Sequence, residues 1–309
     1  MAFDSVMVTG GAGFIGSHTV EALLGLVQKV WVLDDLSTGS LLNLRTHRGD
    51  RRLRVKHGTV TNYKTVESIA GRVDGIIHLA AIVSPYMSLR SPEITNEVNV
   101  TGTLNVLRAS MKKHVERVVF ASSSSVYGNA SAMPVSEDQV LNPITPYGVS
   151  KLAAERYCVV LSKTNYANCV SLRYFNVYGQ RQSDNPYSGV IAIFASQIAK
   201  GRQPKIYGDG EQRRDFVHVS DVVKANLCAL EVKGDGGEVF NVGTGKATSV
   251  NQLFDLMTKL LNKNGMRPNH VQERIGDIKD SYADVAKSKT FLGFGAEVDL
   301  ERGLRLLFN

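Results

Sequence analysis

The chain has few cysteines and no histidine pattern of the kind that binds metal. Its 309 residues include three cysteines and seven histidines. Cys158, Cys169 and Cys228 form no pair motif, and their neighbours are apolar. We therefore expect reduced thiols in the protein core rather than disulfides. The histidines show no spacing typical of metal ligands, so we predict no metal site.

Long apolar runs are also missing. The longest nearly apolar run, residues 75–83, is far shorter than the roughly 20 residues that a membrane-spanning helix needs. The first residues enter a strand pattern directly, with no basic start and no signal-cleavage site. These features predict a cytoplasmic protein without a membrane partner. No internal repeat, low-complexity tract or obvious flexible linker interrupts the sequence.

The composition is that of a globular protein with a full core. Hydrophobic residues make up 43% of the chain and charged residues 21%. The formal net charge is +7, and residues 45–54 form a basic stretch. Such a stretch could favour a polyanionic partner, but a solvated basic face is the simpler interpretation. Because no basic stretch is interleaved with aromatic residues, we expect no nucleic-acid partner.

Short runs rich in valine, isoleucine and leucine recur along the chain, with helical segments between them. This alternation is typical of parallel strands joined by crossover helices. Nearly continuous apolar content suits strands that are covered on both faces. The sequence therefore predicts an α/β protein with a Rossmann-type doubly wound parallel sheet. The expected strands are residues 6–9, 30–33, 53–55, 75–79, 117–120, 169–173 and 239–242.

A glycine-rich loop follows the first of these strands and precedes an apolar helix. Gly11, Gly13 and Gly16 satisfy the pattern Gly-x-Gly-x-x-Gly. Glycine at these positions permits a tight turn, a close approach of the backbone to pyrophosphate, and close packing of the helix on the strand. The N-terminus of the helix would supply N–H groups to the phosphates. The loop therefore predicts a dinucleotide site.

Asp34 ends the second expected strand, at the distance from the loop that ribose recognition requires. A carboxylate there accepts hydrogen bonds from the adenosine ribose and repels a 2′-phosphate, which favours NAD over NADP. Asp35 could share this role, or it could simply begin the following turn.

The amino-acid composition changes after about Tyr174, where glycine, asparagine, glutamine and proline cluster. We predict an NAD-binding domain over residues 1–173, with a late return to the sheet near residues 217–243. Residues 174–309 would form a smaller C-terminal substrate-binding lobe. The chain is long enough for one large α/β unit with such a lobe.

Two predicted helices carry apolar residues on more than one face. They run from Pro92 to about Lys113 and from Tyr147 to about Lys163. One face of each should cover the sheet, while the other could meet a second subunit. We expect a homodimer, and the alternative is a well-buried helix pair.

Tyr147 and Lys151 lie four residues apart, which places both side chains on one face of a helix. An ammonium beside a phenol favours the phenolate, so the spacing predicts that the pKa of Tyr147 falls from about 10 toward the range of a general base. The serines at 122–125 follow the apolar run 118–120. A hydroxyl at that strand end could share a substrate proton with the phenolate. A solvated helical pair is the alternative.

With these motifs, the chain resembles the extended short-chain dehydrogenase/reductase superfamily, specifically the NAD-dependent sugar-nucleotide epimerases similar to UDP-glucose 4-epimerase. The resemblance runs nearly from end to end. It is carried by residues 9–16, 78–81, 99–103, 122–128, 147–151, 173–179, 214–219, 241–245 and 274–277.

The resemblance implies a role for each matching residue. Tyr147 would be the catalytic base and acid, Lys151 would lower its pKa and bind the nicotinamide ribose, and Ser123 would assist Tyr147. Ser125 completes the implied catalytic set with a hydroxyl near the sugar. The positions implied to bind NAD are Gly10, Gly11, Gly13, Phe14, Ile15, Gly16, Asp34, Asp35, Ser37, Thr38, Gly39, Thr59, Val60, Leu79, Ala80, Ala81, Asn99, Ser122, Tyr147, Lys151 and Tyr174. The positions implied to bind the nucleotide sugar are Ser123, Ser125, Tyr147, Asn176, Val190, Tyr207, Arg214, Arg274, Asp277 and Ser281.

The implied reaction is inversion of C4 of a UDP-hexose through a transient 4-keto sugar. Dehydratases that resemble this chain carry an acid just before their Val-Tyr-Gly segment, and so do decarboxylases of the glucuronate type. This chain has Ser124 and Ser125 there, which disfavours both reactions. Another nucleotide-sugar oxidoreductase or dehydratase remains an alternative, as does a non-enzymatic NAD-sensing protein.

Position 281 borders the 2-position of the sugar in the family. A small residue there leaves room for an N-acetyl group, so Ser281 predicts that UDP-GlcNAc and UDP-GalNAc are used beside UDP-glucose and UDP-galactose. Alternatively, Ser281 merely caps a turn. Two residues near the expected cofactor depart from the family pattern. This chain has Thr59 where some members have an aspartate near adenine, and Val83 where many members have a lysine near the nicotinamide.

Overall fold

Seven strands form one parallel sheet within the described part of the chain. The computed structural model describes residues 3–183, 189–234, 236–273 and 278–308. The strand order is β11-β6-β5-β4-β1-β2-β3, and every neighbouring pair is parallel. The reversal of order at β1 is that of a Rossmann-type sheet, so the predicted fold is confirmed. The strands are β1 (Ser5–Thr9), β2 (Lys29–Asp34), β3 (Leu53–His57), β4 (Gly75–His78), β5 (Arg117–Ser123), β6 (Cys169–Tyr174) and β11 (Val239–Val242).

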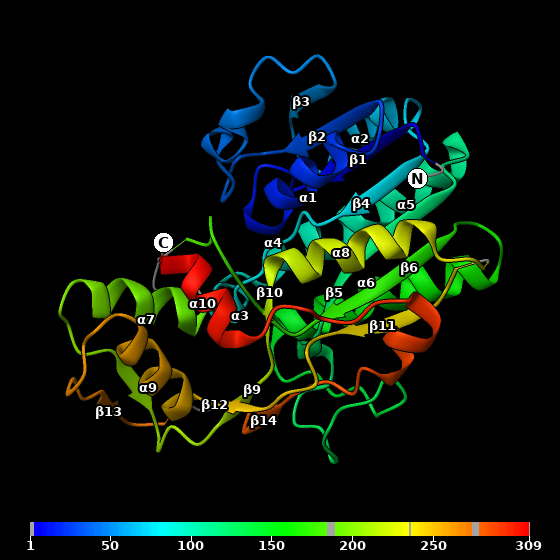
Figure 1. Cartoon of the computed structure of the whole chain (residues 1–309). Coiled ribbons are helices and arrows are strands. Elements are labelled where there is room, and N and C mark those ends of the chain that lie inside the picture. The colour runs from blue at the N-terminus through cyan, green and yellow to red at the C-terminus, as the bar shows by residue number, and fades with distance from the viewer. Residues whose placement is uncertain (1–2, 184–188, 235, 274–277, 309) are drawn as a thin grey trace.

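Helices cover both faces of the sheet (Figure 1). Helices α1 (Phe14–Leu24) and α8 (Val219–Glu231) share one apolar core with the strands. Helices α2 (Tyr63–Ala70), α5 (Gly102–Lys113) and α6 (Pro146–Lys163) share a second core on the other face. Side chains of a strand alternate between the two cores, as Val6 and Met7 of β1 do. The nearly continuous apolar content of the strands is therefore explained by burial on both faces.

The first two-faced helix predicted from the sequence is divided into three parts. It consists of α4 (Pro92–Asn96), a π-helical turn (Glu97–Thr101) and α5. A proline in the first turn opens α4, and the left-handed residue His114 ends α5 after two lysines. Such π-helical turns are frequent at functional sites, and this one contains Asn99. The second predicted helix is α6, and its bounds agree with the sequence pattern.

The C-terminal part builds a separate apolar core from α7 (Val190–Ala199), α9 (Val250–Leu260) and α10 (Leu300–Phe308), and Figure 1 shows these helices gathered at one end of the molecule. The short strands beside them form small sheets. These strands are β7 (Asn176–Tyr178) with β10 (Phe216–His218), β8 (Lys205–Tyr207) with β13 (Asn269–Val271), and β9 (Arg213–Arg214) with β12 (Thr248–Ser249) and β14 (Asp280–Ser281). The domain boundaries at residues 173 and 174 stay a prediction.

The remaining short elements connect these layers. They are the 3-10 helix η1 (Leu41–His47), α3 (Pro85–Arg90), the 3-10 helix η3 (Ser124–Val126) and the π-helical turn η4 (Ser288–Leu292).

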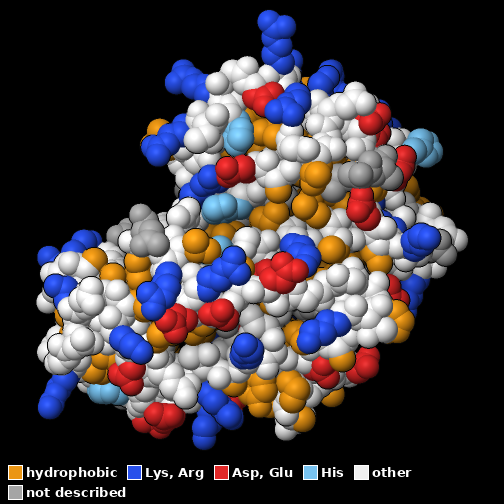
Figure 2. Space-filling view, viewed as in Figure 1, with side chains coloured by type: hydrophobic (Ala, Val, Ile, Leu, Met, Phe, Trp, Pro, Cys, Tyr) orange, Lys and Arg blue, Asp and Glu red, His pale blue; other side chains and the backbone are white. Residues whose placement is uncertain are grey.

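Charges of both signs are mixed on the face shown in Figure 2. The basic stretch at residues 45–54 runs from the end of η1 through the connecting turn into the edge strand β3, and exposed cations on such a strand discourage pairing with another sheet. All three cysteines are free, with Cys158 and Cys169 buried and Cys228 partly exposed. Across the described residues, none of the helices combines the length and the apolar character that crossing a membrane demands.

Candidate active site

The glycine loop between β1 and α1 has the geometry that a dinucleotide needs. Gly10 has a φ of 68°, and a Cβ on it would lie 2.9 Å from the Ala80 nitrogen. A Cβ on Gly16 would lie 2.0 Å from the Gly10 oxygen. Both positions therefore require glycine. Gly13 caps α1 without a side-chain hydrogen bond, and the first turn carries no acid, so its N–H groups suit an anion.

Asp34 lies beside this loop with a fixed and nearly buried carboxylate. It accepts hydrogen bonds from the backbone nitrogens of Ala12 (2.9 Å) and Leu36 (2.8 Å). A Cβ on Gly39 would meet its Oδ1 at 2.9 Å, so the loop passes close over the carboxylate. Asp35 instead accepts from the nitrogen and the hydroxyl of Ser37, at 2.9 and 2.6 Å. Asp35 thus begins an exposed turn with Ser37, which is the other role that the sequence allowed for it.

The loops after β3 and β4 lie next to the glycine loop. The Ala80 nitrogen donates to Thr9 Oγ1 at 3.2 Å, which fixes the segment containing Leu79, Ala80 and Ala81 against β1. Val60 is buried against Gly102, where a Cβ would come within 2.6 Å of the valine side chain. Thr59 is half-buried, and its hydroxyl lies 3.2 Å from that of Thr61. The predicted cofactor positions thus meet at the carboxyl ends of the strands.

His78 connects three elements beneath this region. Its Nδ1 lies 2.6 Å from Thr9 Oγ1 on β1, and its Nε2 lies 3.1 Å from Thr103 Oγ1 on α5. Burial lowers the pKa of His78 to about 3, because the charged imidazolium is disfavoured away from water. The histidine is therefore neutral at physiological pH.

Tyr147, Lys151 and Ser123 come together at the carboxyl end of β5. Thr145 caps α6 by accepting from the Gly148 nitrogen at 3.1 Å, which places Tyr147 in the first turn of the helix. The Tyr147 hydroxyl lies near enough to Ser123 for the serine to favour the ionised phenol and so lower its pKa. Lys151 donates to the carbonyl of Ala121 on β5 at 2.8 Å. All three side chains are buried.

The predicted lowering of the Tyr147 pKa is wrong for the chain by itself. Burial raises the pKa of Tyr147 above 10, and the hydrogen bond to Ser123 only partly opposes this rise. Burial also lowers the pKa of Lys151 to about 8. Both shifts have the same cause, since removal from water disfavours the charged form of either group. The spacing of the two residues cannot reveal this desolvation.

The serine cluster divides between two environments. The Ser123 hydroxyl donates to Ser125 Oγ at 3.1 Å, and it accepts from the Ser125 nitrogen at the same distance. These two serines therefore form one unit beside Tyr147. The Ser122 hydroxyl donates instead to Glu155 Oε2 at 2.6 Å. Any contact of Ser122 with the cofactor would have to use its backbone.

The π-helical turn before α5 orients Asn99. Its side chain exchanges hydrogen bonds with both backbone groups of Ile82, at 2.8 and 3.0 Å, and donates to Ser150 Oγ at 2.9 Å. Tyr174 is buried at the end of β6, and its hydroxyl donates to Asn226 on α8. Asn99 therefore ties the segment after β4 to α6, whereas the polar end of Tyr174 is directed toward α8.

Asp215 holds together the segments that carry the predicted nucleotide-sugar residues. Its backbone carbonyl accepts from the Asn176 nitrogen, and its own nitrogen donates to the Ser281 carbonyl, both at 2.9 Å. Ser281 on β14 pairs with Arg214 on β9. Arg214 Nη1 donates to the carbonyls of Arg213 and Lys279, at 2.9 and 3.1 Å.

The carboxylate of Asp215 adds the segment of Thr244 and Gly245 to this arrangement, and it also binds Ala283, two residues after Ser281. It accepts from the nitrogen and hydroxyl of Thr244, at 2.8 and 2.6 Å, and from the nitrogens of Gly245 and Ala283, at 2.9 and 3.2 Å. Burial nevertheless raises the pKa of Asp215, because desolvation outweighs these hydrogen bonds.

The other predicted substrate residues are more scattered. Val190 opens α7 and packs against the C-terminal core. Tyr207 ends β8, and its carbonyl accepts from Gln212 Nε2 at 2.9 Å. Arg274 and Asp277 lie outside the described residues. Within the described ranges, no group of three or more His, Cys, Asp or Glu side chains could hold a metal ion.

Comparison with known proteins agrees with this geometry. The sequence profile of the NAD dependent epimerase/dehydratase family matches residues 6–243. This chain belongs to that family. A putative UDP-glucose 4-epimerase of Methanocaldococcus jannaschii is 38% identical, over 98% of this chain and 97% of its own length. The resemblance found in the sequence is thereby confirmed, and so is NAD as the cofactor of the family.

Two solved structures show the range of reactions among similar proteins. UDP-N-acetylglucosamine 4-epimerase of Methanobrevibacter ruminantium is 36% identical, with a TM-score of 0.94 over 99% of this chain and 97% of that one. A dTDP-glucose 4,6-dehydratase of Streptomyces venezuelae, solved with NAD, is 29% identical, with a TM-score of 0.92 over 98% and 95%. The family is therefore shown, while the choice among its reactions depends on individual residues.

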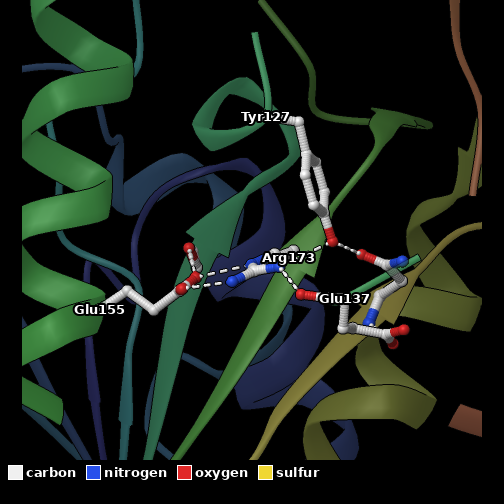
Figure 3. A network of polar contacts seen from close by, with 6 residues as sticks. Tyr127, Glu137, Glu155 and Arg173 are labelled. Atoms are coloured by element: carbon white, nitrogen blue, oxygen red, sulfur yellow. Dashed lines mark hydrogen bonds and ion pairs between the residues drawn. The ribbon is translucent and has the colours of Figure 1, made fainter. Parts of the chain in front are cut away.

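One buried network behind the serine cluster escaped the sequence analysis (Figure 3). Arg173 on β6 and Glu155 on α6 form a two-pronged ion pair with distances of 2.9 and 2.6 Å. Arg173 also donates to the Tyr127 hydroxyl at 2.8 Å. The signal was present, because an arginine in an apolar strand pattern needs a buried partner. Its partner could not be identified without the fold.

Proposed function

We propose that this family member interconverts the C4 epimers of a UDP-hexose through a transient 4-keto sugar. The observation that carries the proposal is the buried pair of Tyr147 and Ser123, with Lys151 one helical turn away. The phenolate of Tyr147 can receive a substrate proton and return it, with the Ser123 hydroxyl beside it to share that proton, and the ammonium of Lys151 would favour this ionised form against the effect of burial. Their position at the carboxyl end of β5 is where ligands bind in sheets of this kind.

The tight turns of the glycine loop and the fixed carboxylate of Asp34 support NAD binding at these residues. When bound, NAD would take a hydride from C4 of the sugar and give it back. Tyr147 would remove the proton of the C4 hydroxyl, with Ser123 sharing it. After the keto sugar has presented its other face, Tyr147 would return the proton to the C4 oxygen. No atom is gained or lost in the cycle.

The same residues favour epimerisation over elimination of water. A dehydratase must protonate a leaving hydroxyl, and a carboxylic acid is suited to that step. The short helix η3 next to Tyr147 carries Ser124 and Ser125 instead. The nearby Glu155 is engaged with Arg173. This arrangement supports a reaction in which one tyrosine handles the only mobile proton.

For the substrate, we propose UDP-glucose and UDP-galactose together with their N-acetylated counterparts. Ser281 is small and lies beside Arg214 in the β9–β14 pair. Arg214 is suited to a diphosphate because its planar fork offers several donors. A similar enzyme is named for UDP-N-acetylglucosamine, which supports this range. Uridine as the base is likewise supported by the named relatives.

The assembly we propose is a homodimer. Apolar side chains on α4 and α6 stay exposed, with 54% of Ile94, 53% of Val149 and 55% of Val160 accessible. A second copy could cover this face in a symmetric contact. The molar mass in solution, measured by light scattering, tests the dimer.

We further propose that the protein acts in the cytoplasm, where the free cysteines would stay reduced.

The test of the function uses four substrates without added cofactor. Purified protein is incubated separately with UDP-glucose, UDP-galactose, UDP-GlcNAc and UDP-GalNAc, and the epimers are separated by chromatography. We expect each epimer pair to converge on one mixture from both sides. Stoichiometric consumption of added NAD would indicate a net oxidoreductase instead. Loss of water from the sugar would indicate a dehydratase.

A further inference from the structure

The buried ion pair of Glu155 and Arg173 is the centre of an extended polar network. Glu155 is fully buried, and Arg173 is 2% exposed. The guanidinium faces the carboxylate with two nearly parallel contacts, Nε to Oε2 and Nη2 to Oε1. Figure 3 shows Tyr127 approaching the same guanidinium from another direction. Charges buried this deeply are tolerated only where their partners are fixed.

The network joins the elements that carry the proposed catalytic residues. Ser122 on β5 donates to Glu155 on α6 at 2.6 Å, so the carboxylate binds groups from both β5 and β6. Arg173 Nη1 also donates to the Glu137 carbonyl at 3.1 Å. The Tyr127 hydroxyl donates to Asn241 on β11 at 2.6 Å. One helix and three strands are therefore tied through side chains at one point.

This point lies immediately beside the reacting groups. Ser122 precedes Ser123 in the chain, and Glu155 follows Lys151 by one helical turn and Tyr147 by about two. A sliding or rotation of α6 against β5 would change the separation of Tyr147 and Ser123. Apolar packing alone permits such small shifts. The two-pronged ion pair fixes α6 against β6 in both distance and orientation, and the Ser122 hydroxyl ties the same carboxylate to β5.

We propose that Glu155, Arg173 and Ser122 form a positioning clamp that sets α6 against β5, and thereby holds Tyr147 in place against Ser123. The three residues do not touch substrate or cofactor in this role. The inference deepens the proposed function, because it assigns a purpose to residues behind the same site.

A purely structural role is the competing explanation. In that case, loss of the network would lower stability and leave the geometry at Tyr147 unchanged in the molecules that stay folded. A positioning role changes the environment of the Tyr147 phenol in the folded protein. The decisive readout must therefore report on Tyr147 itself.

The test compares Ser122→Ala and Glu155→Gln with the control Ser110→Ala. Ser110 is a buried serine of α5 that donates only to the Leu107 carbonyl within its own helix, at 2.8 Å. Tyrosines are labelled with ¹³C at Cζ in each protein, and the signal of Tyr147 is assigned by its loss in Tyr147→Phe. The signal is then followed against pH by NMR, and folding is checked by thermal unfolding.

We expect the Tyr147 signal and its titration to shift in folded Ser122→Ala and to match the wild type in Ser110→Ala. The kcat for epimerisation should fall about 10-fold to 100-fold in Ser122→Ala, because a small misplacement of reacting groups is costly. The KM for the sugar should stay within about threefold, because the nucleotide contacts are intact. Glu155→Gln should show larger changes in the same direction, and if it does not fold, Ser122→Ala decides.

A folded Ser122→Ala whose Tyr147 signal and titration match the wild type would overturn the clamp. So would a Ser110→Ala that changes the signal equally. If the wild type epimerised none of the four substrates, the proposed function would be wrong. The NMR comparison would still decide the clamp, since it needs no turnover.

Discussion

On the proposed catalytic side of the candidate site, the Glu155 carboxylate binds side chains, whereas on the proposed nucleotide side the Asp215 carboxylate binds mainly backbone groups. Glu155 binds Arg173 and Ser122 through their side chains. Asp215 binds the backbone nitrogens of Thr244 and Gly245. The first arrangement fixes the orientation of functional groups, and the second fixes only the path of the chain. The proposed proton-transfer groups are therefore held through side chains, whereas the proposed nucleotide side is held mainly through the path of its backbone.

The largest effect should come from Tyr147→Phe. Removal of the phenol beside Ser123 should lower kcat by about 10²-fold to 10⁴-fold, the usual contribution of a positioned acid or base. The bound NAD content should stay unchanged, as measured by absorbance after denaturation. The control is Tyr157→Phe, which removes an exposed hydroxyl from the same helix. Equal loss in both variants would break the assignment of the catalytic side.

Ser281→Tyr should sharpen the description of the nucleotide side. An aromatic ring at this half-buried position would crowd an N-acetyl group, and overpacking by this amount costs about 1–3 kcal/mol. We expect kcat/KM to fall about 10-fold to 100-fold for UDP-GlcNAc, with little change for UDP-glucose. Ser281→Ala should keep both substrates. Parallel loss of both substrates in the tyrosine variant would contradict a role in sugar selection.

Asp215→Asn should separate the two sides by their kinetic constants. The wild-type carboxylate accepts hydrogen bonds from three backbone N–H groups. The NH₂ group of asparagine would face at least one of these donors, and the lost hydrogen bond costs about 1–3 kcal/mol of stability. We expect the KM for the UDP-sugar to rise about tenfold, with a much smaller change in kcat. Asp255→Asn on the exposed surface of α9 is the control. A selective fall in kcat would show that the two sides are not independent.

The last prediction concerns stability in acid rather than activity. His78 has a pKa of about 3 in the folded protein and 6.5 ordinarily, so the unfolded chain binds the extra proton between these values. This contribution to stability is complete above about pH 6.5 and is lost by about 1.4 kcal/mol for each pH unit below it. The free energy of unfolding is measured with urea for the wild type and for His78→Gln between pH 4 and pH 7. The variant should lack the part of the loss in acid that comes from protonation of His78. His270→Gln, at an exposed histidine, should follow the wild type.

Much of the fold could be predicted because strand and loop signals are local. The apolar runs located the seven strands, including β11, which pairs with β6 at the edge of the sheet. Gly16 and Asp34 could be proposed as cofactor residues for the same reason, since the roles expected of them follow from their distance to β1. The contact of Tyr127 with Asn241 joins residues 114 positions apart. Such pairing depends on the tertiary fold and leaves no spacing pattern in the sequence.

The electrostatics of the site could not be predicted for a related reason. The sequence placed Lys151 beside Tyr147 on one helix face, and the structure brings both to Ser123 and Ala121 on β5. The sequence could not reveal how deeply the two side chains are buried, and this burial raises the pKa of Tyr147 and lowers the pKa of Lys151. Likewise, Asp215 stood in the sequence as a neighbour of Arg214, and its four accepted hydrogen bonds emerged only with the fold.

The most direct test of the account follows the hydrogen at C4. UDP-galactose carrying deuterium at C4 is converted in ordinary water, and UDP-galactose without label is converted in deuterated water. If Tyr147 handles only the hydroxyl proton and hydride leaves and returns, the product should keep its deuterium in the first case and gain none at C4 in the second. Exchange of the C4 hydrogen with solvent would contradict the central claim.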